Sequence, residues 1–210
     1  MRESPERYSA TARWLHWATV VLVIALIVTG KSGIEADEPG SRSLFWHSSL
    51  GVLVMLVAMA RIAWALVRPG PALPSSLSRA NRLLARGTHV ALYLLLFALP
   101  ISGWLAVSAQ GASVSFFGAL SLPRWEVPLG PVETTAGARQ RDAPAEGEEA
   151  AVSRESDGEK SENPMGELHE TLGNLLLALA TLHVLGALAH QFYWRDGLLE
   201  RMLPRSEQRT

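Results

Sequence analysis

The sequence predicts an all-α integral membrane protein, built as a bundle of four transmembrane helices. The first observation is composition: 48% of the 210 residues are hydrophobic and only 19% are charged, which is unusual for a soluble domain. The second is distribution, because nearly uncharged segments cover residues 14–30, 44–66, 88–109 and 168–194. A helix needs about 20 apolar residues to cross a bilayer core, and these segments have about that length.

Charge and cysteine content exclude several classes of function. The formal net charge is −1, so no strong positive field points to nucleic acid as a partner. The chain has no cysteine, which removes disulfides, thiolate metal sites, iron–sulfur clusters and covalently attached c-type haem. Any redox or metal chemistry must therefore rest on histidine, carboxylates or a bound cofactor.

The first apolar segment predicts an uncleaved membrane span. No Ala-x-Ala-like cleavage site follows it, and Thr29-Gly30-Lys31 runs into the acidic residues Glu35, Asp37 and Glu38. A removed signal peptide would end in small residues at a cleavage site. We therefore expect this segment to remain as the first helix of the bundle.

Basic residues predict the orientation of the four spans. The connection 67–87 is basic, with no acidic residue, and holds Arg68, Arg79, Arg82 and Arg86. The two tails are also rich in arginine, with Arg2, Arg7 and Arg13 before the first span and Arg195, Arg201, Arg205 and Arg209 after the last. Because such residues mark the cytoplasmic side, both termini and the middle connection are predicted to be cytoplasmic.

The chain is therefore predicted to divide into four parts. Residues 1–109 hold the first three helices, residues 110–167 form a long outward loop, residues 168–194 form the fourth helix, and residues 195–210 are a cytoplasmic tail. Within the outward loop, residues 133–164 are rich in Ala, Gly, Ser, Glu and Arg without periodicity. This composition predicts a disordered acidic insertion, which is either a solvated spacer or a segment that attracts a basic partner.

Histidines are the best candidates for chemistry. All six lie within or at the ends of the apolar spans: His16, His47, His89, His169, His183 and His190. A polar group in a membrane span is costly unless it has a partner, so each histidine is a functional candidate. Any single one could instead be a hydrogen-bonded packing or headgroup residue.

The fourth span carries three of these histidines in a row. His169 and His183 are fourteen residues apart, which places them about 40° from each other around an ideal helix and ~21 Å apart along it. This spacing fits two sites stacked across a hydrocarbon core of about 30 Å. His190 as the inner group would extend the gap to ~31 Å and move one site towards the headgroups. Histidines at this spacing could also simply join helices by hydrogen bonds.

The second span repeats a pattern from the fourth. His47 is followed by Gly51, and His169 by Gly173, in the shared sequence His-x-x-Leu-Gly. Both spans run from outside to inside, so the two histidines are predicted at similar depth. Glycine one turn beyond each lets a large flat ligand approach the backbone. The pattern predicts a slot for a porphyrin held by both imidazoles; close packing of small residues is the alternative.

An inner site is expected near the start of the first span. His16 lies there, and the neighbouring Arg13 could pair with an acidic group such as a haem propionate. Its partner cannot be chosen by depth, because His89 and His190 lie near the inner surface and His183 lies deeper. The spacing of residues therefore leaves all three histidines as possible partners of His16.

Several motifs together resemble a known family. They are the start Arg13-x-x-His16-Trp17, His47 with Gly51, the stretch Pro100-Ile101-Ser102-Gly103-Trp104, His169-x-x-x-Gly173, His183, and the ending His190-Gln191-Phe192-Tyr193-Trp194-Arg195-Asp196-Gly197-Leu198-Leu199-Glu200-Arg201-Met202-Leu203-Pro204. In order and spacing the chain resembles the bacterial cytochrome b561 family, related to the cytochrome b subunits of nickel–iron hydrogenases and formate dehydrogenases. The long Glu-rich outer loop departs from that family.

The resemblance implies a site for two non-covalent b-type haems. It implies that His47 and His169 hold the outer haem iron, and that His16 and His183 hold the inner one. His89 and His190 then become secondary groups that line a haem, contact a propionate or belong to a quinone site.

The resemblance also implies a function in electron transport. The expected protein lies in the bacterial inner membrane and passes single electrons between a periplasmic donor and ubiquinone or its quinol. Superoxide is one candidate donor, because members of the family oxidise it. The alternative is a membrane-anchoring cytochrome b subunit that relays electrons for a separate dehydrogenase or hydrogenase. A haem-free four-helix transporter or scaffold is a third interpretation.

Overall fold

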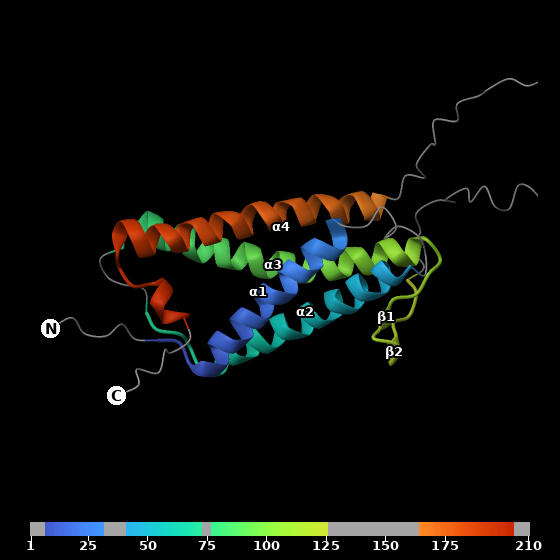
Figure 1. Cartoon of the computed structure of the whole chain (residues 1–210), viewed down its shortest axis with the longest axis horizontal. Coiled ribbons are helices and arrows are strands. Elements are labelled where there is room, and N and C mark those ends of the chain that lie inside the picture. Colours follow the sequence, from blue (N-terminus) through green and yellow to red (C-terminus); the bar gives the residue numbers. More distant parts are fainter. Residues whose placement is uncertain (1–6, 32–40, 73–76, 126–163, 204–210) are drawn as a thin grey trace, which may run out of the picture.

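Four long helices make up most of the protein (Figure 1). The computed structural model describes residues 7–31, 41–72, 77–125 and 164–203. The helices are α1 (Ala10–Lys31), α2 (Arg42–Val67), α3 (Arg79–Ala109) and α4 (Pro164–Ala189). Each belongs to a helical segment long and apolar enough to cross a membrane, so the chain is mostly helical and multi-pass, as predicted.

Serine caps fix where two of the helices begin. The hydroxyl of Ser41 accepts a hydrogen bond from Leu44 N at 3.1 Å, and that of Ser78 accepts one from Asn81 N at 3.1 Å. Such caps satisfy amide groups that have no partner within the helix. Because Ser78 caps α3, this helix begins at Arg79, well before the apolar segment 88–109. Three arginines of the basic connection thus lie on a helix: Arg79, Arg82 and Arg86.

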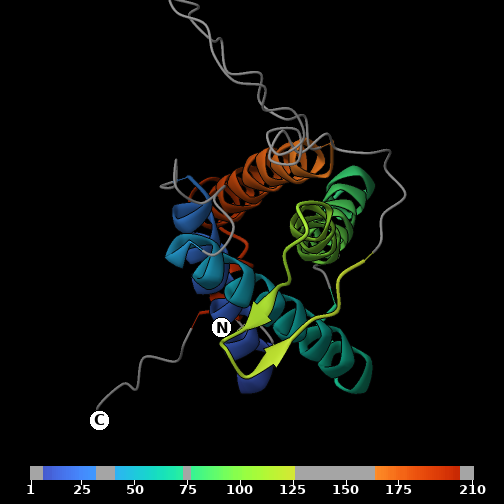
Figure 2. The ribbon, with the colours of Figure 1, turned by 90° about the vertical axis from the view of Figure 1, so that its right-hand side faces the viewer.

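Neighbouring helices pack in sequence order. Close contacts join α1 to α2, α2 to α3 and α3 to α4. The small core consists of Val54, Ala58 and Leu96, with Leu26 and Phe97 packed against it. Viewed from the end, α4 lies beside α3, and α1 lies beside α2 (Figure 2).

Large apolar side chains remain exposed over the outside of the bundle. Examples are Val21, Leu66, Leu94 and Val184, each more than half exposed. In water such a surface would be unstable, but lipid tails are as apolar as these side chains. The surface therefore fits a bundle surrounded by lipid.

A β-hairpin covers the end of the bundle at which α2 and α4 begin (Figure 1). Its strands, β1 (Ser115–Phe116) and β2 (Leu120–Ser121), pair antiparallel. The fully buried Ser49 of α2 holds it, because the Ser49 hydroxyl donates to Ser115 O and accepts from Phe117 N. The sequence did not predict this hairpin. Residues 133–163 of the predicted insertion lie outside the described residues.

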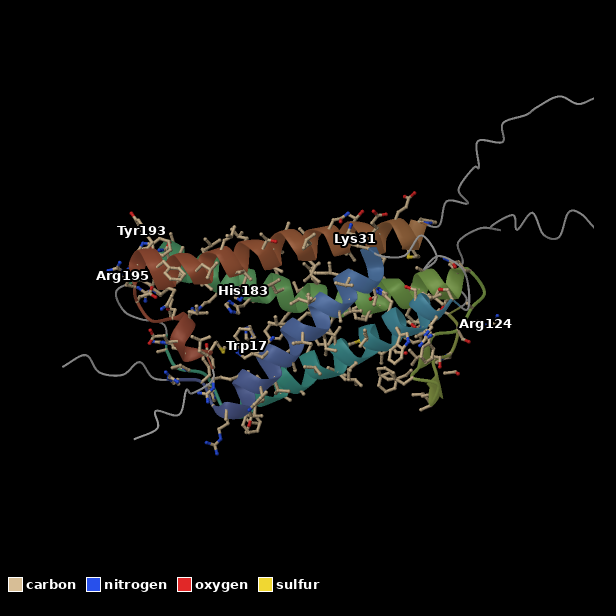
Figure 3. All side chains as sticks on the ribbon, in the orientation of Figure 1. Trp17, Lys31, Arg124, His183, Tyr193 and Arg195 are labelled. Carbon is tan, nitrogen blue, oxygen red and sulfur yellow. The ribbon has the colours of Figure 1, made fainter. Side chains whose placement is uncertain are left out.

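A C-terminal hook, residues 190–203, covers the opposite end. It begins with a π-helical turn, η2 (His190–Trp194), and includes a short 3₁₀ turn, η3 (Leu199–Arg201). The chain reverses at Arg195, whose φ of 51° is left-handed. Trp17 Nε1 then donates to Met202 O at 2.9 Å, which ties the hook to α1 (Figure 3). The hook thus joins the beginning of α1 to the end of α4.

Candidate functional site

Two pairs of histidines lie at opposite ends of the bundle. Successive helices run in opposite directions, so the beginnings of α2 and α4 lie at the hairpin end and the beginnings of α1 and α3 at the hook end (Figure 1). His47 and His169 lie near the hairpin, and we call them the outer pair. His16 and His183 lie nearer the hook, and we call them the inner pair. The outer pair joins α4 to α2, and the inner pair joins α4 to α1. Helix α4 has few other contacts with either of these helices.

The two rings of the outer pair lie face to edge. Their centroids are 6.0 Å apart and their planes are at 84°. Thr29 Oγ1 lies 3.0 Å from Nδ1 of His47. On the other side, Nδ1 of His169 lies 3.1 Å from Ser102 Oγ and 3.0 Å from Leu99 O. Each ring is therefore fixed through its Nδ1 atom.

These contacts define which nitrogen of each outer ring carries the proton. The Thr29 hydroxyl donates its single hydrogen to a carbonyl of its own helix, with Ala25 O at 2.8 Å, and the Ser102 hydroxyl donates to Leu99 O at 3.0 Å. A hydroxyl has one hydrogen to give, so towards the histidines both oxygens act as acceptors. Leu99 O can only accept, so Nδ1 of His169 is the protonated donor and Nε2 keeps a lone pair for a metal. We assign the same tautomer to His47, with the Thr29 hydroxyl donating to its own helix.

Two glycines let the outer rings approach the helix backbones. A Cβ atom on Gly30 would lie 3.1 Å from Cε1 of His47, and one on Gly103 would lie 3.0 Å from Cε1 of His169. Each glycine directly follows the hydroxyl residue that holds the same ring. The sequence signal for this arrangement is the pair of dipeptides Thr29-Gly30 and Ser102-Gly103, whose role the sequence analysis missed.

The inner pair has a similar separation and different neighbours. The ring centroids of His16 and His183 are 6.5 Å apart, with planes at 68°. His183 lies on the side of α4 that faces the other helices (Figure 3). The exposed His89 lies beside this pair, with its ring centroid 5.0 Å from that of His183 and its Nδ1 2.6 Å from Ala85 O.

Arg61 is a neighbour of the inner pair that the sequence did not single out as a site residue. Its Nη2 atom lies 3.3 Å from Nδ1 of His16, and its guanidinium carbon lies 5.2 Å from the centre of the Tyr93 ring. The residue lies within α2, inside a span that is otherwise uncharged after Arg42. A cation at such a depth is costly, which makes it a functional candidate.

Three other predicted site residues have less specific surroundings. Arg13 Nη1 donates to Tyr8 O at 3.2 Å. A Cβ atom on Gly51 would meet no other group within 4 Å, and one on Gly173 would meet Leu99 Cδ2 at 4.0 Å. The helix surface at Gly51 therefore borders open space, which leaves room for a flat ligand.

His190 is engaged within the C-terminal hook. Its Nδ1 atom lies 2.6 Å from Oδ2 of Asp196, and its ring contacts that of Trp194, with centroids 4.6 Å apart and planes tilted by 41°. Oδ1 of the same aspartate accepts from Leu198 N at 3.2 Å. These contacts fix the reversal of the chain, and a role in the hook explains His190 without a ligand.

Asp196→Ala should therefore destabilise the hook while leaving both histidine pairs in place. Loss of a partly buried, charge-assisted contact costs about 1–3 kcal/mol of unfolding free energy. A thermal melt in detergent should show a lower midpoint than the matched variant Glu200→Ala, which changes an acidic residue of the same hook. An unchanged melt would show that the contact between His190 and Asp196 adds nothing to stability.

The two pairs fit a metal that is bound mainly by another group. Two imidazoles that share one metal, with bonds of about 2 Å, have ring centroids roughly 6 Å apart, and both pairs match this separation. Among the described residues, no three His, Asp or Glu side chains converge on a point where a bare ion could bind. A porphyrin would supply the remaining four ligands in its plane. The donor set therefore fits haem better than a free metal ion.

This fold and this arrangement of histidines define a class of membrane cytochrome. Residues 7–205 match the family described as prokaryotic cytochrome b561, and the chain belongs to that family. The expected family is therefore confirmed. Its members are b-type membrane cytochromes of electron transfer.

Two relatives match along nearly their whole length. Cytochrome b561 homolog 2 of Escherichia coli (strain K12) is 31% identical over 206 residues, which cover 97% of this chain and 94% of the relative. The probable superoxide oxidase CybB of Yersinia pestis is 28% identical over 205 residues, which cover 95% of this chain and 97% of the relative.

Proposed function

We propose that this protein is a di-haem cytochrome b that passes single electrons across the bacterial inner membrane. The observation that carries the proposal is the presence of two similar imidazole pairs, 6.0 Å and 6.5 Å between centroids, at opposite ends of one bundle. Since His169 and His183 belong to the same helix, the two sites are ~21 Å apart along it. Two stacked redox centres suit electron transfer from one membrane face to the other.

The proposed ligands are the four paired histidines. His47 and His169 would hold the outer haem, and His16 and His183 the inner one, with Gly51 and Gly173 leaving space beside the outer porphyrin. Held by two imidazoles, each haem would keep no open position on its iron and would supply one-electron transfer. Arg13 is proposed as a partner for a propionate of the inner haem.

The rest of the outer site serves to position the ligands. Thr29, Ser102 and the carbonyl of Leu99 orient the rings through Nδ1 and leave Nε2 for the iron, as second-shell partners of metal-bound histidines generally do. Gly30 and Gly103 allow this close approach. The hairpin is held to α2 by Ser49, two residues beyond His47.

Gly103→Val should disturb the outer site without changing any ligand. The Cβ atom alone would come within 3.0 Å of the His169 ring, and the added methyl groups would force that ring away from Ser102 and Leu99 O. We expect at least a tenfold weaker retention of the outer haem, in line with the loss of second-shell support. The measure is haem content after purification.

A matched control is Gly87→Val, on the same helix, where a Cβ atom meets nothing within 4 Å. Both changes put a β-branched residue into α3, so they share any general cost to the helix. Equal haem loss from the two variants would contradict a specific role for Gly103.

The membrane orientation is part of the same proposal. Arginines at the helix ends near the hook, among them Arg68, Arg82 and Arg201, favour a cytoplasmic hook end with both termini inside. The hairpin end and the loop that follows it would then be periplasmic. The outer haem would face a periplasmic donor, and the relative named as a probable superoxide oxidase makes superoxide one donor to test.

Quinone is the proposed partner on the membrane side. His89 is exposed at the inner end beside His183, where a quinone or quinol from the bilayer could approach. A quinone takes up two electrons and two protons to become quinol, so the protein would deliver the electrons one at a time. The competing proposal is that the chain anchors a separate dehydrogenase or hydrogenase and relays its electrons.

Purification in mild detergent distinguishes these two proposals. The full chain and a variant lacking residues 133–163 are mixed with a ubiquinol analogue, and haem reduction is followed optically. Reduction of both proteins without a co-purifying subunit supports a stand-alone carrier with a dispensable insertion. A stoichiometric partner that is lost on deletion, with no reaction with quinol, would support the subunit instead.

A further inference from the structure

We propose that Arg61 sets the reduction potential of the inner haem above that of the outer one. The inference rests on the proposed binding of two haems and adds a direction to the electron transfer. The observation behind it is a difference in charge between the two sites. Each outer histidine has an oxygen atom beside its Nδ1, whereas Nδ1 of His16 lies 3.3 Å from a guanidinium nitrogen of Arg61.

The outer neighbours make their imidazoles more electron-rich. Ser102 Oγ and Leu99 O both accept from Nδ1 of His169, and Thr29 Oγ1 accepts from Nδ1 of His47. Acceptors at this position raise the basicity of a metal-bound imidazole. Basic axial ligands stabilise oxidised iron, which carries more positive charge, so these contacts lower the outer potential.

Arg61 acts on the inner ligand in the opposite sense. A guanidinium has only donors and stays charged, so at 3.3 Å from Nδ1 it cannot serve as an acceptor for His16. With iron on Nε2, the neutral imidazole carries its proton on Nδ1, so the guanidinium then acts on the ring through space as a nearby cation and not as a hydrogen-bond donor. It also opposes further positive charge at the iron, so the reduced state is favoured.

The position of Arg61 makes its charge effective. The residue is six positions before the end of α2, about 9 Å along the helix axis, and its guanidinium lies over the Tyr93 ring. No carboxylate among the described residues lies within ion-pair distance to neutralise it. A charge within a helix bundle is screened much less than a charge in water.

Two other functions of this arginine make different predictions. It could extend towards the cytoplasmic headgroups, as arginines near helix ends do, in which case its replacement would not alter a haem potential. It could instead anchor a propionate of the inner haem, in which case its replacement would release that haem. Potential and haem content therefore separate the three functions.

The test is an optical redox titration of the purified protein that resolves both haems. The inner haem is identified as the one missing from His183→Ala. The variants are Arg61→Gln and Arg61→Met, which remove the charge, and Arg61→Lys, which keeps it. Arg68→Gln is the matched control, since Arg68 lies seven residues further along the chain, directly after α2, and is exposed.

In the unchanged protein we expect the inner haem to have the higher potential. Both neutral variants should reduce the ratio of reduced to oxidised inner haem at a fixed potential at least tenfold, which is 59 mV for one electron. The outer haem should change by much less. Arg61→Lys should restore most of the shift, and Arg68→Gln should leave both potentials unchanged.

Several results would overturn the proposal. These are an inner potential below the outer one, an unchanged inner potential in the neutral variants, or an equal shift in Arg61→Lys. Loss of the inner haem alone would show that Arg61 anchors a propionate of that haem. Loss of both haems from both neutral variants would show that Arg61 is needed for the structure of the bundle. Absence of haem from the unchanged protein would instead refute the proposed function itself.

Discussion

His47→Ala and His169→Ala should each remove the outer haem and leave the inner one in place. Each change removes one of the two imidazoles proposed to hold the outer iron. Loss of a ligand should cost more than the 10- to 100-fold in metal affinity that loss of a second-shell partner costs. Haem content should therefore fall from about two per chain to about one, as measured by pyridine haemochrome against protein concentration.

The unaffected site provides an internal control for this result. The inner pair lies ~21 Å away along α4, so its haem should keep its spectrum and potential in both variants. Ser48→Ala, next to His47, should keep both haems. Retention of two haems in His47→Ala or His169→Ala would show that the outer pair does not bind iron.

The second large effect is expected at the inner end. His16→Ala and His183→Ala should remove the inner haem, again reducing the content to about one per chain. His89→Ala and His190→Ala should keep both haems and at most shift a potential or the reaction with quinol. The physical reason is that His89 is exposed and His190 is held by Asp196, whereas the two inner histidines lie close together.

The same four variants test the choice among the inner histidines. His183 and His190 are seven residues apart on the same chain segment, so either could in principle face the inner site. Loss of the inner haem from His190→Ala, with retention in His183→Ala, would refute the assignment. It would also mean that the hook rearranges when haem binds.

Hydropathy and spacing predicted the parts of this protein that are determined by single helices. Long uncharged segments define the spans whatever their neighbours are, because a helix in lipid must satisfy its own backbone. The fourteen-residue spacing of His169 and His183 likewise depends only on helix geometry. The structure brings a second histidine to each of them, and their service as haem ligands stays a prediction.

Contacts between helices could not be predicted in the same way. The roles of Thr29 and Ser102 depend on which helix faces which, and a single sequence with many apolar positions does not specify that. Arg61 was visible as a charge inside the second span, but its position beside His16 requires the crossing of α1 and α2. The hairpin was missed because its strands have only two residues each, too short for an alternating pattern.

The hook shows a further limit of reading spans from hydropathy. The apolar segment 168–194 continues to Trp194, yet regular α-helix ends at Ala189 and a π-helical turn follows. The contact between His190 and Asp196, and the left-handed Arg195 between them, fix this change. This contact and this left-handed residue depend on backbone geometry, which cannot be predicted from composition.

The central claim is that this bundle binds two haems through two pairs of imidazoles. The most direct measurement is the amount of b-type haem per chain in the purified full-length protein, together with its reduced optical spectrum. The proposal predicts about two haems per chain, extractable without covalent attachment, with the low-spin spectrum of iron bound by two nitrogen ligands. A folded protein with no haem, or one whose haem is high-spin at both sites, would contradict it.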